Sequence, residues 1–175
     1  TSGVLSFKSA PDYKKPKDND KNNSYEVKVF AKDNNGNISN QNVTINVNSV
    51  IDSVGKLSLQ KDFNGKYYFQ KSGGNLISIK DPSGRQVSDK SYSGWSLVGA
   101  EEVSGTNEVL WKHSGGLFFH WKLDSNGRRK AGKIIRGDQI YNYEKSFDQD
   151  FNSDSHKGNP YSDIETFGNL HLKKD

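Results

Sequence analysis

The sequence contains no cysteine, few hydrophobic residues and no long apolar run. Without cysteine the chain can form neither a disulfide framework nor a zinc site with thiolate ligands. No apolar run approaches about 18 residues, so no membrane span is expected. Only 31% of the residues are hydrophobic and the mean hydropathy is −0.91, so any hydrophobic core must be thin.

Catalytic motifs are also absent. The sequence has no Gly-x-Ser-x-Gly elbow, His-Glu-x-x-His pair, phosphate-binding loop or dinucleotide-binding glycine pattern. The adjacent Glu101 and Glu102 would point to opposite faces of a strand, so they cannot act as acid and base on one bond. His113 and His120 could face each other in a hairpin and bind a transition metal, although surface histidines are the ordinary outcome. We therefore predict that the chain is not an enzyme.

The net charge of +4 comes from 25 Lys and Arg against 21 Asp and Glu. Basic residues cluster only at 14–17 and 128–130. Neither cluster is accompanied by the helix or aromatic platform of a nucleic-acid-binding motif. We expect no nucleic-acid partner.

The abundant residue types favour strands and tight turns. The chain has 9 Phe, 8 Tyr and 3 Trp, and β-branched runs such as 43–47, which suit half-buried strands. Its 17 Gly, together with many Asn and Asp, suit turns with positive φ. This composition predicts an all-β fold.

The chain repeats itself at its end. Residues 51–62 return as 164–175, 113 residues later, with six of twelve positions identical. A unit that restarts after about one domain length indicates a tandem array. We predict three parts: a segment 1–50, a domain 51–163, and the first strand of a following repeat at 164–175.

A fainter repeat lies within residues 51–163. Gly-Gly pairs at 73–74 and 115–116 are each followed by a Gly-Arg pair, at 84–85 and 127–128. Each copy has the pattern of strand, glycine turn, strand and polar turn. The domain is therefore expected to consist of successive antiparallel hairpins, arranged as a compact β-barrel or as a sandwich.

Residues 1–50 predict a hairpin, because 25–31 and 42–48 alternate apolar with polar residues around a turn at 33–37. Together with the Pro-Asp-Tyr segment at 11–13, they resemble the C-terminal half of a bacterial cadherin-like domain. The resemblance implies a partial Ig-like β-sandwich. It also offers a second calcium site whose carboxylates would be Asp12, Asp18, Asp20 and Asp33. Lys14 replaces an acidic residue of that pattern, and solvated turns are the alternative.

Three blocks in the second part carry a more specific resemblance. They are Gly-Trp-Ser-Leu-Val-Gly-Ala-Glu at 94–101, Val-Leu-Trp-Lys at 109–112 and Trp-Lys-Leu-Asp-Ser-Asn at 121–126. Residues 51–163 resemble the tryptophan-rich C-terminal domain family found in repeat arrays of cyanobacterial surface proteins. Arg128 follows Gly127 where the family usually has Trp. The resemblance implies a secreted, surface-associated protein with no known catalytic activity.

Segment 148–158 carries oxygen-bearing side chains at alternate positions, which allows a loop to converge on calcium. The predicted calcium ligands are Asp148, Asp150, Asn152, Asp154 and the backbone carbonyl of His156. The segment departs from an EF-hand loop at Ser155, where glycine is usual, and at Tyr161, where a bidentate glutamate is usual. A turn without metal is the alternative.

Aromatic residues are numerous for so small a core. Tyr92 and Trp95 could form an exposed platform that binds sugar rings through apolar contact. The alternative is that the aromatic residues are core. Strand alternation places Phe119 and Trp121 on one face and His120 on the other, which predicts a buried Trp121 and a surface His120.

We interpret the sequence as a non-catalytic extracellular repeat module. Its expected role is that of a structural or adhesive spacer in a large bacterial surface protein, with calcium as a brace. The alternative is a carbohydrate-binding module that uses exposed aromatic residues. The expected partners are neighbouring repeats, and cell-surface glycans or other surface proteins.

Overall fold

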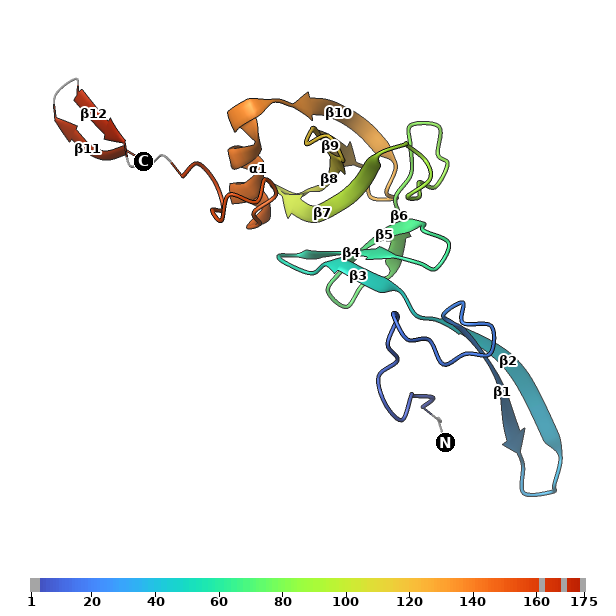
Figure 1. The fold of residues 1–175 in the computed structure, drawn as a ribbon. Coiled ribbons are helices and arrows are strands. Elements are labelled where there is room, and N and C mark those ends of the chain that lie inside the picture. The colour runs from blue at the N-terminus through green and yellow to red at the C-terminus, as the bar shows by residue number, and fades with distance from the viewer. Residues whose placement is uncertain (1–3, 161–162, 168–169, 174–175) are drawn as a thin grey trace. The chain divides into compact units, whose positions relative to one another are not determined.

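The computed structural model describes residues 4–160, 163–167 and 170–173 (Figure 1). Within these residues almost all regular structure is β, with one 3₁₀ turn and one short α-helix, which confirms the predicted all-β class. The chain divides into two units, residues 1–49 and 50–175. No helix in the described part of the chain is long and apolar enough to cross a membrane.

The first unit contains one antiparallel hairpin, β1 (Ser24–Lys32) and β2 (Ile38–Asn46), as the alternating pattern predicts. Tyr25 pairs with Ile45 across it. Phe30 remains 62% exposed. Within residues 4–160, every buried apolar side chain belongs to the second unit.

The second unit contains two four-stranded antiparallel sheets, in each of which neighbouring strands are consecutive in sequence. Both sheets are open among the described residues, so the sandwich alternative fits and the closed barrel does not. The strands of the first sheet are β3 (Ser49–Asp52), β4 (Leu57–Lys61), β5 (Tyr67–Lys71) and β6 (Leu76–Ser78). Those of the second are β7 (Trp95–Val103), β8 (Thr106–His113), β9 (Phe118–Leu123) and β10 (Arg129–Ile135).

Several hairpins use the same five-residue turn. At Asp81 the carboxylate accepts hydrogen bonds from the backbone N–H groups of Ser83, at 2.8 Å, and Arg85, at 3.0 Å. Gly84 takes the positive φ of 90° that closes the turn. Asp124 accepts equivalent bonds from the residues two and four positions on. These turns account for the successive hairpins that the fainter repeat within residues 51–163 predicts.

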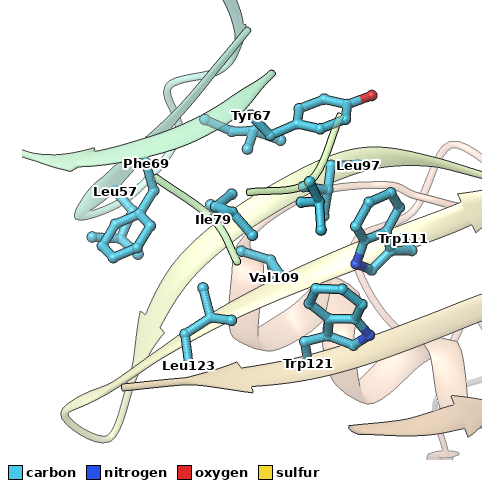
Figure 2. Close-up of a cluster of buried hydrophobic side chains, with 12 residues drawn as sticks. Leu57, Tyr67, Phe69, Ile79, Leu97, Val109, Trp111, Trp121 and Leu123 are labelled. Atoms are coloured by element: carbon cyan, nitrogen blue, oxygen red, sulfur yellow. The ribbon is translucent and has the colours of Figure 1, made fainter. Parts of the chain in front are cut away.

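The main core lies between the two sheets, where residues of β4 and β5 pack against residues of β7, β8 and β9 (Figure 2). Trp111 and Trp121 are its largest side chains, and they are 1% and 2% exposed. The burial of Trp121 agrees with its predicted place in the core. The cluster comprises Leu57, Leu59, Tyr67, Phe69, Ile79, Val87, Leu97, Ala100, Val109, Trp111, Trp121 and Leu123.

A smaller core covers the other face of the β7–β10 sheet. It is formed under the helix α1 (Ile140–Phe147), which follows a short 3₁₀ turn η1 (Gly137–Gln139). The buried members are Leu110, Phe118, Ile135, Ile140, Phe147 and Phe151. The β7–β10 sheet therefore has one face toward the first sheet and the other toward α1.

The helix explains why the prediction of a surface His120 is wrong. His120 lies on the face opposite Phe119 and Trp121, as alternation predicts, but it is only 3% exposed because α1 covers that face. Its ring lies 4.9 Å from that of Tyr143 on α1. The strand register places His120 opposite Leu110 rather than near His113, so the two histidines do not form a metal-binding pair.

The repeated segment at the end of the chain forms a hairpin, β11 (Asp163–Phe167) and β12 (Leu170–Lys173). In the repeat, Leu170 corresponds to Leu57, and each begins a strand, β12 and β4 respectively. Residues 164–175 were expected to form the first strand of a following repeat. Their described part contributes to two strands, which parallels the succession of β3 and β4.

Candidate ligand-binding groove

The second unit contains an aromatic groove with a volume of about 300 Å³. Its walls come from β7, β8, β9, β10 and the segment that precedes β7. The register places Trp111 opposite Phe119 and Phe119 opposite Ile134. We call this cavity the aromatic groove; it is lined by Tyr92, Trp95, Trp111, Phe119, Trp121, Arg129 and Ile134.

The rings of the groove hold one another at edge-to-face and tilted angles. The centroids of Trp111 and Trp121 are 5.0 Å apart, and the Tyr92 ring stands edge-on to Trp111 at 5.4 Å. Trp95 and Phe119 form a further edge-on pair at 6.3 Å. Such contacts fix ring orientation and add about 0.5–1.5 kcal/mol each beyond area burial.

The structure brings together the two residues that the sequence suggests as a platform. The backbone carbonyl of Tyr92 accepts a hydrogen bond from the Trp95 N–H at 3.1 Å, which closes the turn before β7. Both side chains are half-buried. The sequence did not indicate that Trp111, Phe119 and Trp121 would line the same cavity.

Arg129 is a groove residue that the sequence analysis missed. Its guanidinium carbon lies 5.0 Å from the ring centroid of Phe119 and 5.0 Å from that of Trp121. Gly132 lies opposite Trp121 across the β9–β10 pair. A Cβ atom at Gly132 would lie 3.0 Å from both Nε and Nη2 of Arg129, so the glycine leaves the space that the guanidinium occupies. A glycine inside a strand signals such a close approach.

The polar groups of the groove are mainly donors. The indole N–H groups of Trp111 and Trp121 are buried and have no hydrogen-bond partner within the described part of the chain. Arg129 makes no ion pair with any described carboxylate. Burial, with the negative charge of Asp81, raises the pKa of the Tyr92 phenol, so this hydroxyl is neutral at pH 7.

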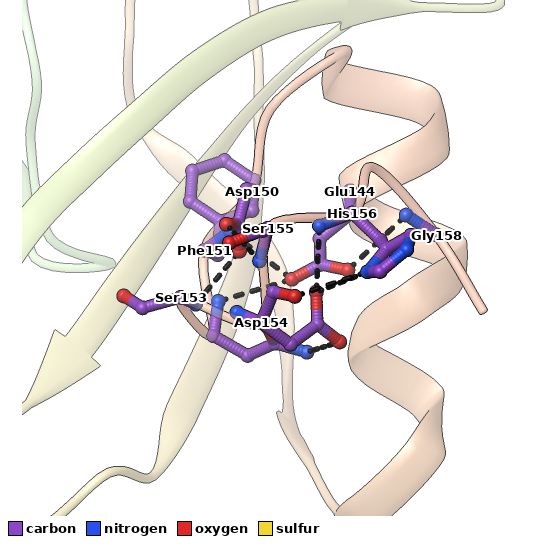
Figure 3. Close-up of polar contacts among 9 residues, drawn as sticks. Glu144, Asp150, Phe151, Ser153, Asp154, Ser155, His156 and Gly158 are labelled. Atoms are coloured by element: carbon purple, nitrogen blue, oxygen red, sulfur yellow. Dashed lines mark hydrogen bonds and ion pairs between the residues drawn. The ribbon is translucent and has the colours of Figure 1, made fainter. Parts of the chain in front are cut away.

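The predicted calcium loop uses its side-chain oxygens to bind its own backbone (Figure 3). The Asp150 carboxylate accepts hydrogen bonds from the N–H groups of Ser153, at 2.7 Å, and Ser155, at 2.9 Å. Asp154 accepts one from the N–H of His156 at 2.9 Å, and Asn152 accepts one from the N–H of Asp154 at 2.8 Å. These bonds form a series of Asx turns.

Two further members of the loop have separate roles. Asp148 ends α1 with a left-handed φ of 54° and pairs with the Lys157 ammonium at 3.0 Å. The His156 ring nitrogen Nδ1 lies 3.0 Å from the backbone oxygen of Asp154. Tyr161 lies outside the described residues.

The residue that organises this loop is Glu144, which the sequence analysis did not single out. Its side chain is fully buried, and Oε1 accepts hydrogen bonds at 3.0 Å from the N–H groups of both Phe151 and Asn152 (Figure 3). Oε2 accepts a third from Gly158 at 3.3 Å. Within the described residues, no group of three or more His, Asp or Glu side chains could hold a metal ion. The loop geometry therefore lends calcium no support, and calcium stays a prediction.

The carboxylates of the second proposed calcium site are not gathered together. Asp12 and Asp18 accept hydrogen bonds from backbone N–H groups within their own turns. The hydrogen bond from the Asn37 side chain lowers the pKa of Asp33. Because Asp33 follows β1 whereas Asp18 and Asp20 precede it, a nine-residue strand separates them, or roughly 30 Å. The structure does not place Asp33 with the other three.

A comparison with protein-family models identifies the family of the second unit. Residues 57–158 match the model of a family described as the tryptophan-rich Synechocystis species C-terminal domain, and the chain belongs to this family. The match excludes residues 1–50, so the cadherin-like resemblance stays a prediction. Comparisons with curated proteins and with solved structures gave no match.

Proposed function

We propose that this tryptophan-rich module is a non-catalytic adhesive unit of a repetitive extracellular surface protein and that its aromatic groove binds a sugar ring of a surface glycan. The observation that carries the proposal is the groove itself, in which half-buried Trp95 and Phe119 continue into buried Trp111 and Trp121. The repeat of residues 51–62 at 164–175 supports placement in an array.

A pyranose ring suits this groove for two reasons. Its C–H faces are apolar and pack on aromatic rings, while its oxygens can accept hydrogen bonds from the guanidinium of Arg129, a half-buried residue of the groove wall. The volume of about 300 Å³ is at the lower end of the range for small-molecule sites. The interlocked rings also hold the groove in one shape, which reduces the entropy lost on binding.

An array would convert weak single sites into strong attachment. Linked modules raise the effective concentration of every further site, so overall affinity can exceed that of one groove by factors of about 10²–10⁴. The same array would act as a spacer, with the two-sheet core of each repeat as a stiff element. Adhesion and spacing are therefore parts of one proposed role.

Intrinsic fluorescence offers a direct test, because all 3 tryptophans of the chain line the groove. The full chain is titrated with a panel of neutral and acidic oligosaccharides while tryptophan emission is recorded. We expect a saturable change for at least one glycan class. The Trp95→Ala variant should lose it while keeping a cooperative thermal transition, because Trp95 is only half-buried.

Phe63→Ala is the matched control, since Phe63 is 54% exposed and does not line the groove. It should bind as the parent chain does. Absence of any saturable change across the panel, or unchanged binding by Trp95→Ala, would overturn the proposal.

A further inference from the structure

We infer that the groove selects an acidic sugar, a uronic acid residue, and that Arg129 binds its carboxylate. This inference rests on the proposed glycan-binding function and names the ligand class for the same site. It is carried by the placement of an arginine without a carboxylate partner against the aromatic rings that would hold the sugar.

Arg129 has hydrogen-bond donors available for a ligand. Its guanidinium contacts the faces of Phe119 and Trp121, and this contact involves the π systems of the rings rather than the N–H groups. A guanidinium carries five N–H donors in a planar fork that fits a carboxylate through two parallel hydrogen bonds. No described carboxylate pairs with Arg129, so the fork remains available to a ligand.

The strand β10 itself makes room for the Arg129 side chain. The β9–β10 register is irregular between Arg129 and Ala131, and Gly132, the next residue, lies opposite Trp121. Any side chain at position 132 would meet the Arg129 side chain at about the 3.0 Å found for a Cβ atom. The strand thus supplies both the cation and the space that lets it lie across the rings. The contacts with the Phe119 and Trp121 rings hold Arg129 in place before a ligand arrives, so less side-chain entropy is lost on binding.

The charge of the groove suits an anionic sugar. The groove offers the Arg129 cation, while Tyr92 is a neutral phenol. A neutral sugar would leave the guanidinium without an opposite charge in a site walled by apolar rings, where charge attraction is stronger than in water. A uronate supplies the opposite charge on the same ring that stacks on the aromatic side chains.

The test compares three probes on the full chain: oligogalacturonate, its methyl ester and dextran sulfate. We expect saturable binding of oligogalacturonate, with at least tenfold weaker binding of the methyl ester, which keeps the ring and removes the charge. Arg129→Gln should weaken oligogalacturonate binding by about tenfold or more and change methyl-ester binding less than twofold. Lys130→Gln is the matched control, because it removes one positive charge from an exposed neighbouring residue.

The outcomes separate this inference from the proposed function. Equal binding of the acid and the ester, with both lost in Trp95→Ala, would overturn the uronate assignment and leave glycan binding intact. Tighter binding of dextran sulfate than of oligogalacturonate would also overturn it, in favour of sulfated sugars. Equal losses in Arg129→Gln and Lys130→Gln would show a general charge effect and remove the role of Arg129. Absence of binding by all three probes would overturn the inference, whereas a neutral glycan that still binds the groove would preserve the proposed function.

Discussion

The two faces of the β7–β10 sheet differ in how their buried polar groups are paired. Under α1, buried His120 lies 2.8 Å from the Glu108 carboxylate, and buried Glu144 accepts three backbone N–H groups. On the groove face, the indole N–H groups of Trp111 and Trp121 have no partner among the described residues. The helix-covered face thus pairs these charged groups within the fold, whereas the groove face presents Arg129 without an ion-pair partner among the described residues.

The largest expected effect on stability comes from removing the Glu144 carboxylate on the helix-covered side of the sheet. Glu144→Ala removes the acceptor of the Phe151, Asn152 and Gly158 N–H groups. Unpaired buried donors cost about 1–3 kcal/mol each, so we expect a loss of about 3 kcal/mol or more in the free energy of unfolding. Urea denaturation measures this loss, with the exposed Glu26→Ala as control. A loss equal to that of the control would show that Glu144 does not organise the loop.

A smaller, pH-dependent effect is expected at Glu108. Burial acts to raise the pKa of this carboxyl, but the hydrogen bond and attraction of His120, together with Lys122, hold it below its ordinary value. The carboxylate therefore contributes stability above the unfolded-state pKa, and this contribution is lost as the pH falls through the lower folded-state pKa.

Glu108→Gln should lower the free energy of unfolding by about 1–3 kcal/mol at pH 7. Its difference from the parent chain should shrink as the pH falls below about 4, in urea denaturation across a pH series. A difference that stays constant down to pH 2 would contradict the role of the charge. Glu26→Gln, at an exposed position, serves as the charge-matched control.

A third prediction concerns Asp81, on the groove side of the second unit. Besides burial, its negative charge raises the pKa of the groove residue Tyr92, and its turn precedes Tyr92 in the sequence. The Ser83 hydroxyl, with hydrogen bonds from Arg85, lowers the pKa of Asp81 to about 2. Asp81→Asn should therefore cost about 1–2 kcal/mol at pH 7, and the difference should vanish between about pH 4 and pH 2. Thermal melts at several pH values measure this, with exposed Asp138→Asn as control. An undiminished difference at pH 2 would exclude a contribution from the ionised form.

The smallest effect is expected in the loop beyond Glu144. Asp150→Ala combined with Asp154→Ala removes acceptors of N–H groups that are exposed or only partly buried, so we expect a loss of about 1 kcal/mol or less. Melts in EDTA and in millimolar calcium distinguish the two interpretations of these carboxylates. A calcium-dependent rise in Tm that the double variant abolishes would establish the calcium site predicted from the sequence. Equal Tm values in both conditions would favour the Asx turns alone.

The sequence allowed the hairpins to be predicted because their determinants are local. Alternation predicted the β1–β2 hairpin, and the repeated glycine pairs predicted consecutive hairpins in the second unit. Pairs such as Phe119 and Trp121 could be assigned to one face because side chains alternate along a strand. Tyr92 and Trp95 could be singled out because aromatic residues beside a glycine turn are distinctive.

The sequence by itself determined the β class, the turns and which side chains share a strand face. Only the tertiary structure decided what covers each face, because that depends on segments distant in the chain. The helix α1, which begins 17 residues after the end of β9 (140 − 123), buries His120, and a loop beyond that helix gives Glu144 its partners. The glycine at 132 lets Arg129 lie over the groove rings, a relation that strand alternation alone does not reveal. Burial and hydrogen-bond pairing are properties of packed surfaces, whereas periodicity is a property of one strand.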